Sequence, residues 1–329
     1  LISCSRVSLF DAAFPGTLPV LNASAVDQAV RTALALGSNV NRCSVFERKH
    51  YYYSDLPHGY QITQQRKPIA SGGSLPLIFE ATPSEKGDPK DSPPPQGEEG
   101  SDGEQSSKPR SVGITRIQLE VDSGKSLHDR GEAKGVDTAR SFVDLNRAGT
   151  ALMEIVLEPE IRSAAEAGAA IRSLQLLLRK LGTCDGNMEE GSMRCDLNVS
   201  VRPSGSCRMG ERVEVKNLNS VRYLMTAAGA EARRQTRQLE LGGRKVERET
   251  RGFDVAKGET VLLRRKEGSA DYRFFPEPDL PPLVITEAQV EAMKVTLPEL
   301  PEATMARLSR EFGLSRNLSR LLVCAAGGA

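Results

Sequence analysis

Acidic residues recur at strand-like positions, and they are the first side chains in the sequence that could do chemistry. Carboxylates that a sheet gathers on one face suit Mg²⁺, which takes few protein oxygens and completes its shell with water and phosphate. A solvated outer sheet face with charges spread for solubility would give the same alternation, so the pattern leaves both interpretations open. The residues concerned are Glu120, Asp122, Glu154, Glu189, Glu190 and Asp196.

Glu154 differs from the others in its neighbours. It stands in the run ALMEIVLE between Met153 and Ile155, where we expect it to be buried. A buried ionised carboxylate is costly unless it is paired or binds a metal. The sequence therefore predicts a partner or a metal at Glu154.

Other short motifs exclude several classes of site. Gly124-Lys125-Ser126 resembles the end of a phosphate-binding loop, but the earlier glycine is missing, so Lys125 remains only a candidate phosphate contact or part of a turn. None of the three histidines has a Cys or His at zinc-ligand spacing, and no G-x-S-x-G elbow is present. The six cysteines lack C-x-x-C spacing and are expected to be scattered free thiols.

Basic residues concentrate in one part of the chain. Residues 202–273 hold 17 Lys+Arg and 10 Asp+Glu, whereas the whole chain carries a net charge of only +1. Such a block fits either an RNA backbone or a solvated helix and strand edge. Aromatic residues make up 5% and Trp is absent, which argues against base stacking as the main device. No apolar run approaches the length of a membrane span.

The elements that must position these residues alternate between strands and helices. Helical spacing is found at 25–36, at 163–182, where Ser163 and Glu166 form a capping-box pattern, and at 220–241. Strand-like runs are found at 114–121, 152–157, 193–202, 212–216, 245–250 and 260–266, and the text turns helical again beyond Ile285. This order predicts an α+β fold: a mostly antiparallel sheet with helices packed on it, followed by a small helical region.

One segment breaks the globular composition. Residues 81–110 carry no aliphatic side chain larger than Ala and include three consecutive prolines. Such a stretch buries too little apolar surface to offset its ordering entropy, so we expect a disordered insertion. Strand-like text on both sides predicts an enlarged loop between two neighbouring strands.

Six long strings in one order carry a resemblance to a known family. They closely resemble the B subunit of the aspartyl/glutamyl-tRNA amidotransferases, over nearly the whole chain from Pro15 apart from the insertion. The strings are PGTLPVLN, ERKHYYYSDLPHGYQITQ, VDLNRAGT, MEEGSMRCDLNVSVRP, VEVKNLNSVR and DYRFFPEPDLPPL.

The resemblance implies a two-stage, ATP- and Mg²⁺-dependent reaction. The side-chain carboxyl of a mischarged Glu-tRNA(Gln) or Asp-tRNA(Asn) is phosphorylated, and ammonia then replaces the phosphate. It also implies partners: the glutaminase, or A, subunit, which sends ammonia through a polar channel, and the small C subunit. The implied fold is a cradle around an antiparallel sheet, here residues 1–295, followed by a helical domain that begins at 296–329 and is cut short.

Site residues follow from the same resemblance. Glu154 matches a metal-binding Glu of the family, and Glu120, Asp122 and Lys125 fall in a second family motif. The resemblance implies that these four residues are catalytic. In the second motif Gln118 stands in the place of a His, and Val121 in the place of a Glu taken as a metal ligand. The channel or cavity wall is expected to include Glu189, Glu190, Arg194, Asp196, Asn198, Ser200, Lys216, Asn219, Asp271 and Arg273.

The sequence leaves two main functional hypotheses and favours one kind of compartment. Glu154 and the intact MEEGSMRCDLNVS string favour a transamidating subunit, whereas Val121 favours a catalytically impaired assembly subunit; an archaeal paralogue with a large folded insertion ranks last. On the departures we expect little kinase activity from the isolated chain. The Pro/Glu/Ser insertion favours a mitochondrion or plastid over a bacterial cytoplasm.

Overall fold

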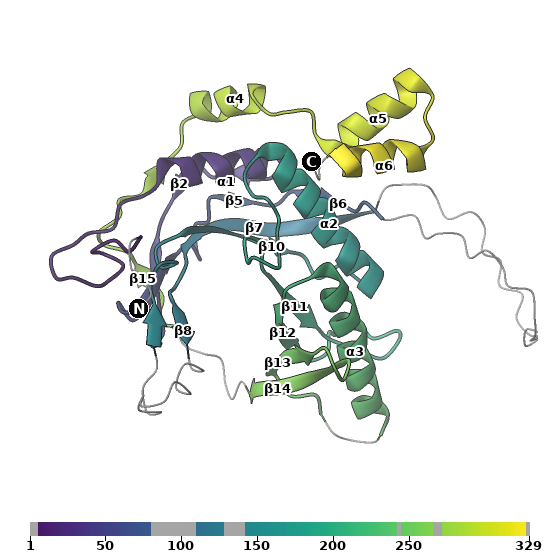
Figure 1. Cartoon of the computed structure of the whole chain (residues 1–329), viewed down its shortest axis with the longest axis horizontal. Helices are drawn as coiled ribbons and strands as arrows, with labels where there is room; N and C mark the ends of the chain where they lie inside the picture. The colour runs from purple at the N-terminus through teal and green to yellow at the C-terminus, as the bar shows by residue number, and fades with distance from the viewer. Residues whose placement is uncertain (1–5, 80–109, 128–141, 242–244, 266–271, 327–329) are drawn as a thin grey trace, which may run out of the picture.

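The computed structural model describes residues 6–79, 110–127, 142–241, 245–265 and 272–326. It combines antiparallel sheets with packed helices, which confirms the α+β class. Helices α1 and α2 lie over strands β7 and β10, and the sheet containing β11–β14 lies against α3 (Figure 1). The division at residue 296 and the cradle form of the domain stay predictions.

The first sheet is built around one long strand. Strand β7 (Ser111–Val121) pairs antiparallel with β10 (Ala151–Leu157) and with the short strands β5 (Ala70–Ser71) and β6 (Ser74–Pro76), and β5 pairs in turn with β1 (Asn39–Val40). On β7, Ile117 and Leu119 face the main hydrophobic core. Because side chains alternate along a strand, Gln118 and Glu120 face the other way.

The insertion is flanked as the sequence predicts. Strands β6 and β7 are antiparallel neighbours, with Pro76 opposite Ser111. The prediction of an enlarged loop between neighbouring strands is therefore confirmed. The predicted disorder concerns residues 81–110, of which all but Arg110 lie outside the described residues.

Two helices form the outer layer of the first sheet. Helix α1 (Ala23–Ala35) begins at an Asn22 cap, and α2 (Ala164–Leu181) runs from Ser163 to a left-handed Gly182, as the spacing predicts. Only half of the predicted capping box forms. Ser163 accepts the Glu166 backbone N–H, but the Glu166 carboxylate accepts from the Arg162 N–H and pairs with Arg110.

The second sheet has the order β11-β12-β13-β14. Helix α3 (Val221–Glu240) packs on it and on α2. The β12–β13 pairing is parallel and the other two are antiparallel. The bounds are β11 Cys195–Val199, β12 Val213–Leu218, β13 Glu249–Asp254 and β14 Glu259–Arg265. Strand β11 is thus shorter than predicted at both ends, and β13 begins four residues later than the predicted run at 245–250.

Three smaller pairings complete the strands. Strand β3 (Glu47–His50) lies between β4 (Tyr60–Thr63) and β15 (Phe275–Pro276), and β2 (Cys43–Ser44) pairs with β16 (Leu283–Val284). Strand β8 (Lys125–Leu127) pairs with β9 (Phe142–Asp144). The segment after residue 272 therefore returns to the N-terminal strands.

The last described part of the chain is helical, as predicted. Helix α4 (Glu287–Val295) contacts α1, whereas α5 (Pro301–Phe312) and α6 (Arg316–Ala326) pack mainly on each other. Among the described helices, none combines the length and the apolar character that crossing a bilayer requires. The five cysteines in the described ranges are free thiols, as expected: Cys43, Cys184, Cys195, Cys207 and Cys324.

Candidate functional site

Two of the predicted carboxylates meet on the solvent-side face of the first sheet. Gln118 lies opposite Glu154 in the β7–β10 register. Its side-chain nitrogen donates to Glu154 Oε2 at 2.7 Å and to Glu120 Oε1 at 2.9 Å. One amide thus holds two carboxylates side by side. We call Glu120, Gln118 and Glu154 the carboxylate pair with its bridging amide.

Side chains of β4 complete the surroundings of Glu120. Thr63 Oγ1 donates to Glu120 Oε1 at 2.5 Å, and Gln61 Nε2 lies 3.4 Å from Oε2. Arg116 donates to Gln118 Oε1 at 2.6 Å, which directs the amide nitrogen of Gln118 toward the carboxylates. Gln118 is 2% exposed, so packing fixes its position.

Glu154 is not buried, contrary to the sequence prediction. The residue is exposed because it lies on the face away from the core, and the apolar Met153 and Ile155 point the other way into the core. The expected partner is Gln118. Partial desolvation raises the pKa of Glu154, and the nearby charge of Glu120 adds to this, against the smaller effects of Lys49 and Arg116. A cation between the two carboxylates would relieve the repulsion.

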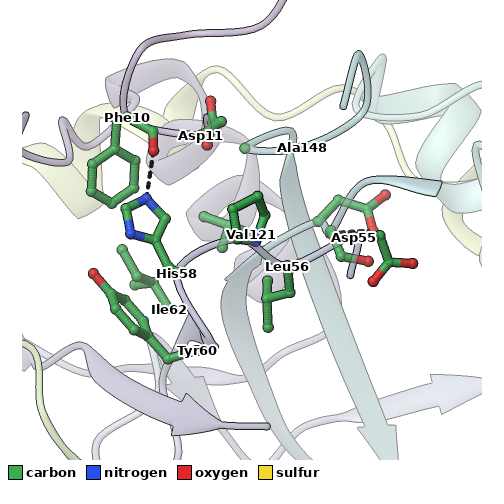
Figure 2. A pocket seen from close by; sticks show the side chains of 13 residues that line it. Phe10, Asp11, Asp55, Leu56, His58, Tyr60, Ile62, Val121 and Ala148 are labelled. Atoms are coloured by element: carbon green, nitrogen blue, oxygen red, sulfur yellow. Dashed lines mark hydrogen bonds between the residues drawn. The ribbon is translucent and has the colours of Figure 1, made fainter. Parts of the chain in front are cut away.

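Val121 lies on the opposite face of β7 from this pair. It packs against the main core and lines a small, largely apolar pocket with Phe10, His58 and Ile62 (Figure 2). A carboxylate at position 121 would point into that pocket and away from Glu154. Strand alternation puts Glu120, and not residue 121, on the face of Glu154. The interpretation of Val121 as a lost metal ligand stays a prediction.

Asp122 forms ion pairs with two arginines. It is 6% exposed; Arg147 lies 3.1 Å from its Oδ2, and Arg194 forms a two-nitrogen contact with the same carboxylate. Such pairing holds a turn together and leaves few lone pairs for a metal. Asp122 and Arg194, both predicted as site residues, thus contact each other at the end of β7.

A second polar group lies on β11 and β12. Lys216 Nζ is 3.1 Å from Asp196 Oδ2 and 3.6 Å from Glu214 Oε1. Burial alone would lower the pKa of Lys216, but these two carboxylates outweigh it and the pKa is raised. Asp196 also contributes to the raised pKa of Glu154, so this group lies near the carboxylate pair.

Lys216 lies at a β-bulge between β11 and β12. The β11–β12 register shifts between Cys195 and Leu197, and Asn217 takes a left-handed φ of 61°. The extra residue lets Lys216 and Asn217 follow each other on the polar side before Leu218 returns to the core. Asn tolerates this backbone region better than most residues, which is the signal in KNLNS that sequence reasoning missed.

The remaining predicted wall residues are spread along the same strand and its surroundings. Asn198 is exposed on β11 on the face of Asp196, as the alternation predicts, and Ser200 follows the strand. Asn219 is exposed just before α3, and Lys125 is exposed on β8 opposite Asp144.

Three of the predicted wall residues, Glu189, Glu190 and Arg273, lie outside the second sheet, and Asp271 lies outside the described residues. Glu189 and Glu190 lie exposed on a turn whose N–H groups bond to Asn187, not on a strand as the sequence suggested. Arg273 has a left-handed φ of 45°, and its carbonyl bonds to His50 Nδ1 at 2.9 Å.

Lys49 and Tyr51 were not among the predicted site residues, yet both border the carboxylate pair. Lys49 is an electrostatic neighbour of Glu154, and its ammonium lies 5.0 Å from the Tyr272 ring centroid. Desolvation and then the charge of Glu120 raise the pKa of Tyr51 to about 12. Both residues stand in the string that carried the resemblance, but nothing in their spacing marked them.

The residues present fit a magnesium ion, although the described residues contain no cluster of three or more His, Cys, Asp or Glu side chains suited to a metal. Mg²⁺ is commonly held by one or two carboxylates together with substrate phosphates and water. Glu120 and Glu154 supply two carboxylates at solvent. Their mutual repulsion is the condition that a divalent cation would remove.

The fold and this face define an α+β domain with a carboxylate pair on the polar face of its main sheet. A family model described as the GatB/GatE catalytic domain matches residues 3–291, and the chain belongs to that family.

Curated relatives agree over nearly the whole chain. The B subunit of the mitochondrial glutamyl-tRNA(Gln) amidotransferase of Phytophthora infestans is 49% identical over 98% of this chain and 62% of its own length. The B subunits of the aspartyl/glutamyl-tRNA(Asn/Gln) amidotransferases of Acidiphilium cryptum and Gluconobacter oxydans are 50% and 51% identical, each over 97% of this chain and 59% of the relative. The chain thus spans about three fifths of the length of these relatives.

Proposed function

We propose that this chain is the catalytic part of an amidotransferase B subunit that converts a mischarged aminoacyl-tRNA to its amide form. The substrate would be Glu-tRNA(Gln), Asp-tRNA(Asn) or both, and the reaction would consume ATP. The observation that carries the proposal is the carboxylate pair on the polar face, held by Gln118 and bordered by Lys49 and Arg116. Membership of the family and the names of the relatives support it.

In this proposal the chain's own residues prepare two steps. Glu120 and Glu154 would hold Mg²⁺, which when bound neutralises the charge of the transferred phosphoryl group. Lys49 and Arg116 lie near Glu154 as fixed cations and would orient the anionic carboxyl of the substrate. The carboxyl would be activated as an acyl phosphate and then attacked by ammonia.

The polar group on β11 and β12 suits the second step. Asp196, Lys216 and Asn198 form a polar face near Glu154. Ammonia needs hydrogen-bonding groups along its path to stay out of bulk water. We propose that this face guides ammonia from the glutaminase, or A, subunit of the complex, with the small C subunit as a further partner.

The alternative is a catalytically impaired assembly subunit of the same complex. It rests on Val121, which faces the core and not the carboxylate pair. The expectation of little kinase activity in the isolated chain also rests on Gln118, which stands in the place of a family His. An organellar compartment also stays a proposal, because the mitochondrial relative and the bacterial relatives are equally similar.

The test uses the reconstituted amidotransferase that contains this chain. Glu154→Gln removes one charge of the pair without changing shape, and we expect glutamine-dependent amidation to fall at least about a hundredfold. Glu291→Gln, an exposed site on α4, is the matched control and should leave the rate unchanged. Titration with Mn²⁺, followed by water proton relaxation, should show weaker metal binding in Glu154→Gln alone.

The outcomes distinguish the substrate, the assigned site and the proposed function. Assays with Glu-tRNA(Gln) and with Asp-tRNA(Asn) identify the substrate. If wild type amidates tRNA and Glu154→Gln is equally active, the assigned site is excluded. A complex that amidates neither tRNA would refute the proposed function.

A further inference from the structure

Tyrosines are scarce in this protein and gather in one place. The chain has six, and five of them, Tyr51, Tyr52, Tyr53, Tyr60 and Tyr272, lie in the two segments 51–60 and 272–275, which are far apart in sequence. These segments meet in space, because the Tyr51 and Tyr272 rings lie 6.4 Å apart and His50 stacks on Phe275 at 4.7 Å. Low aromatic content therefore hides a local aromatic cluster.

Two rings of this cluster are exposed. Tyr52 is 85% and Tyr53 55% exposed, whereas Tyr51 and Tyr60 are partly buried. Two Tyr52 ring carbons lie 3.0 and 3.2 Å from where a Cβ on Gly59 would stand, and Gly59 has a left-handed φ of 72°. The ring therefore rests on bare backbone on one side.

Cations accompany the rings. Arg264 on β14 donates to the Tyr53 hydroxyl at 3.2 Å, although the two residues are 211 positions apart in sequence. Lys49 lies 5.8 and 5.0 Å from the Tyr51 and Tyr272 ring centroids. Exposed rings beside fixed cations are the combination that binds single-stranded nucleic acid, since the rings stack on bases and the cations meet phosphates.

The exposed rings are linked to the carboxylate pair through Tyr51. The Tyr51 hydroxyl donates to Gln61 Oε1 at 3.4 Å, and Gln61 Nε2 lies 3.4 Å from Glu120 Oε2. The Tyr53 ring lies 5.5 Å from that of Tyr51, and Tyr51 is an electrostatic neighbour of Glu120. Lys49 likewise lies near both groups, 5.8 Å from the Tyr51 ring centroid and as an electrostatic neighbour of Glu154. Tyr51 and Gln61 would therefore lie between a base stacked on Tyr53 and Glu120.

We propose that the exposed rings of Tyr52 and Tyr53, together with Arg264, form a stacking site for a nucleobase beside the carboxylate pair. The inference rests on the proposed function. Two nucleobases have a reason to be there, the unpaired 3′-terminal base of the tRNA and the adenine of ATP. The terminal base fits the geometry better, since it carries the amino acid that must reach the pair.

The test measures binding and needs no turnover. An RNA stem with an unpaired 3′ tail carries 2-aminopurine at its last position, and quenching of its fluorescence reports stacking in the reconstituted complex. We expect Tyr52→Ala and Tyr53→Ala each to weaken binding about tenfold and to reduce the quenching. Tyr53→Phe keeps the ring and should stay within about threefold of wild type.

Controls and a second arm decide the source of the base. Phe312→Ala removes another exposed aromatic ring, 64% exposed on α5, and should change nothing. In parallel, ATP binding is titrated with the same variants. Weakened RNA binding with normal ATP binding identifies the 3′ end, and the reverse identifies the adenine.

Normal binding of both ligands by Tyr52→Ala and Tyr53→Ala would overturn the stacking site. If wild type still amidates tRNA in that case, the proposed function stands without it. If the complex neither amidates tRNA nor responds to Glu154→Gln, the proposed function fails whatever the tyrosines do.

Discussion

At the scale of single residues, the direction of a side chain decides its role. Glu120 and Val121 are neighbours in sequence, yet one faces the carboxylate partner and the other the core. A motif written in one line does not show this difference. In the folded chain, Glu120 on β7 and Glu154 on β10 both lie on the polar face of the first sheet.

Val121→Glu tests this interpretation. The new carboxylate would enter a largely apolar pocket next to the buried Asp122, so we expect a loss of about 2 kcal/mol in the free energy of unfolding. Mn²⁺ affinity should not increase. Urea denaturation and metal titration measure the two effects, and Val20→Glu, at a position 91% exposed, is the control. Tighter metal binding by Val121→Glu would support the view that position 121 is a ligand site.

At the scale of elements, a buried polar network fixes α3 on the second sheet. Glu231 is 0% exposed and accepts hydrogen bonds from Arg234, Gln235 and Thr260. Gln235 also bonds to the backbone at both Val199 and Val201. The network therefore holds the end of β11, where Asn198 and Ser200 lie.

The pH dependence of stability should report this network. Burial alone would raise the pKa of Glu231, but the hydrogen bonds from Arg234, Thr260 and Gln235 outweigh it and the pKa is lowered. A carboxyl with a lowered folded-state pKa stabilises the fold above its unfolded pKa, and this is lost as pH falls through the folded value. Glu231→Gln should therefore lose about 2 kcal/mol at neutral pH and approach wild type below about pH 4.

Urea denaturation of both proteins between pH 3 and pH 7 (about the span of the titration) measures this difference. Glu240→Gln, at the exposed end of α3, should follow wild type throughout. A gap between Glu231→Gln and wild type that is independent of pH would mean that shape, and not charge, is what Glu231 contributes.

At the scale of the whole molecule, the segment after residue 272 returns to the N-terminal strand β3. Arg48 on β3 makes a two-nitrogen pair with Glu277, at 2.8 Å for each contact, and reaches Asp279 at 3.0 Å. Its guanidinium also lies 4.2 Å from the Tyr60 ring centroid. The Glu277 side chain is fully buried, so it depends on Arg48 for its charge balance.

Removing one partner of this pair should cost more than removing both. Arg48→Met leaves a buried, unpaired carboxylate, and we expect a loss of about 3 kcal/mol. Adding Glu277→Leu should recover much of it, because the apolar pair fills similar space. A double-mutant cycle in urea gives the coupling energy. Additive losses would show that the segment is held by backbone pairing alone.

The net charge is also a property of the whole molecule. The value of +1 combines a basic block of +7 at 202–273 with a predicted insertion of −3 and other acidic residues. In the structure much of the block is paired, as in Arg234 with Glu231 and Arg251 with Glu249. The charge count alone therefore overstates the free positive charge of this region.

The sequence by itself determined the class of fold, the longer helices and strands, and the family. Apolar spacing predicts α1, α2 and α3, alternation predicts β7, β10 and β11, and the flanking strands place the insertion, because these signals depend on local period and end-capping. The strings that carried the resemblance lead to the family that the whole-chain comparison shows. Local patterns suffice for such predictions.

Only the tertiary structure decided which residues meet. The pairing of Glu120 and Glu154 through Gln118, the pairing of Asp122 with arginines, and the exposure of Glu154 depend on strand register and on which face the helices cover. The tyrosine cluster needed the return of the segment after residue 272 to β3. Contacts between residues that lie on different strands leave no periodic signal in one sequence, because they are fixed by packing and not by local conformation.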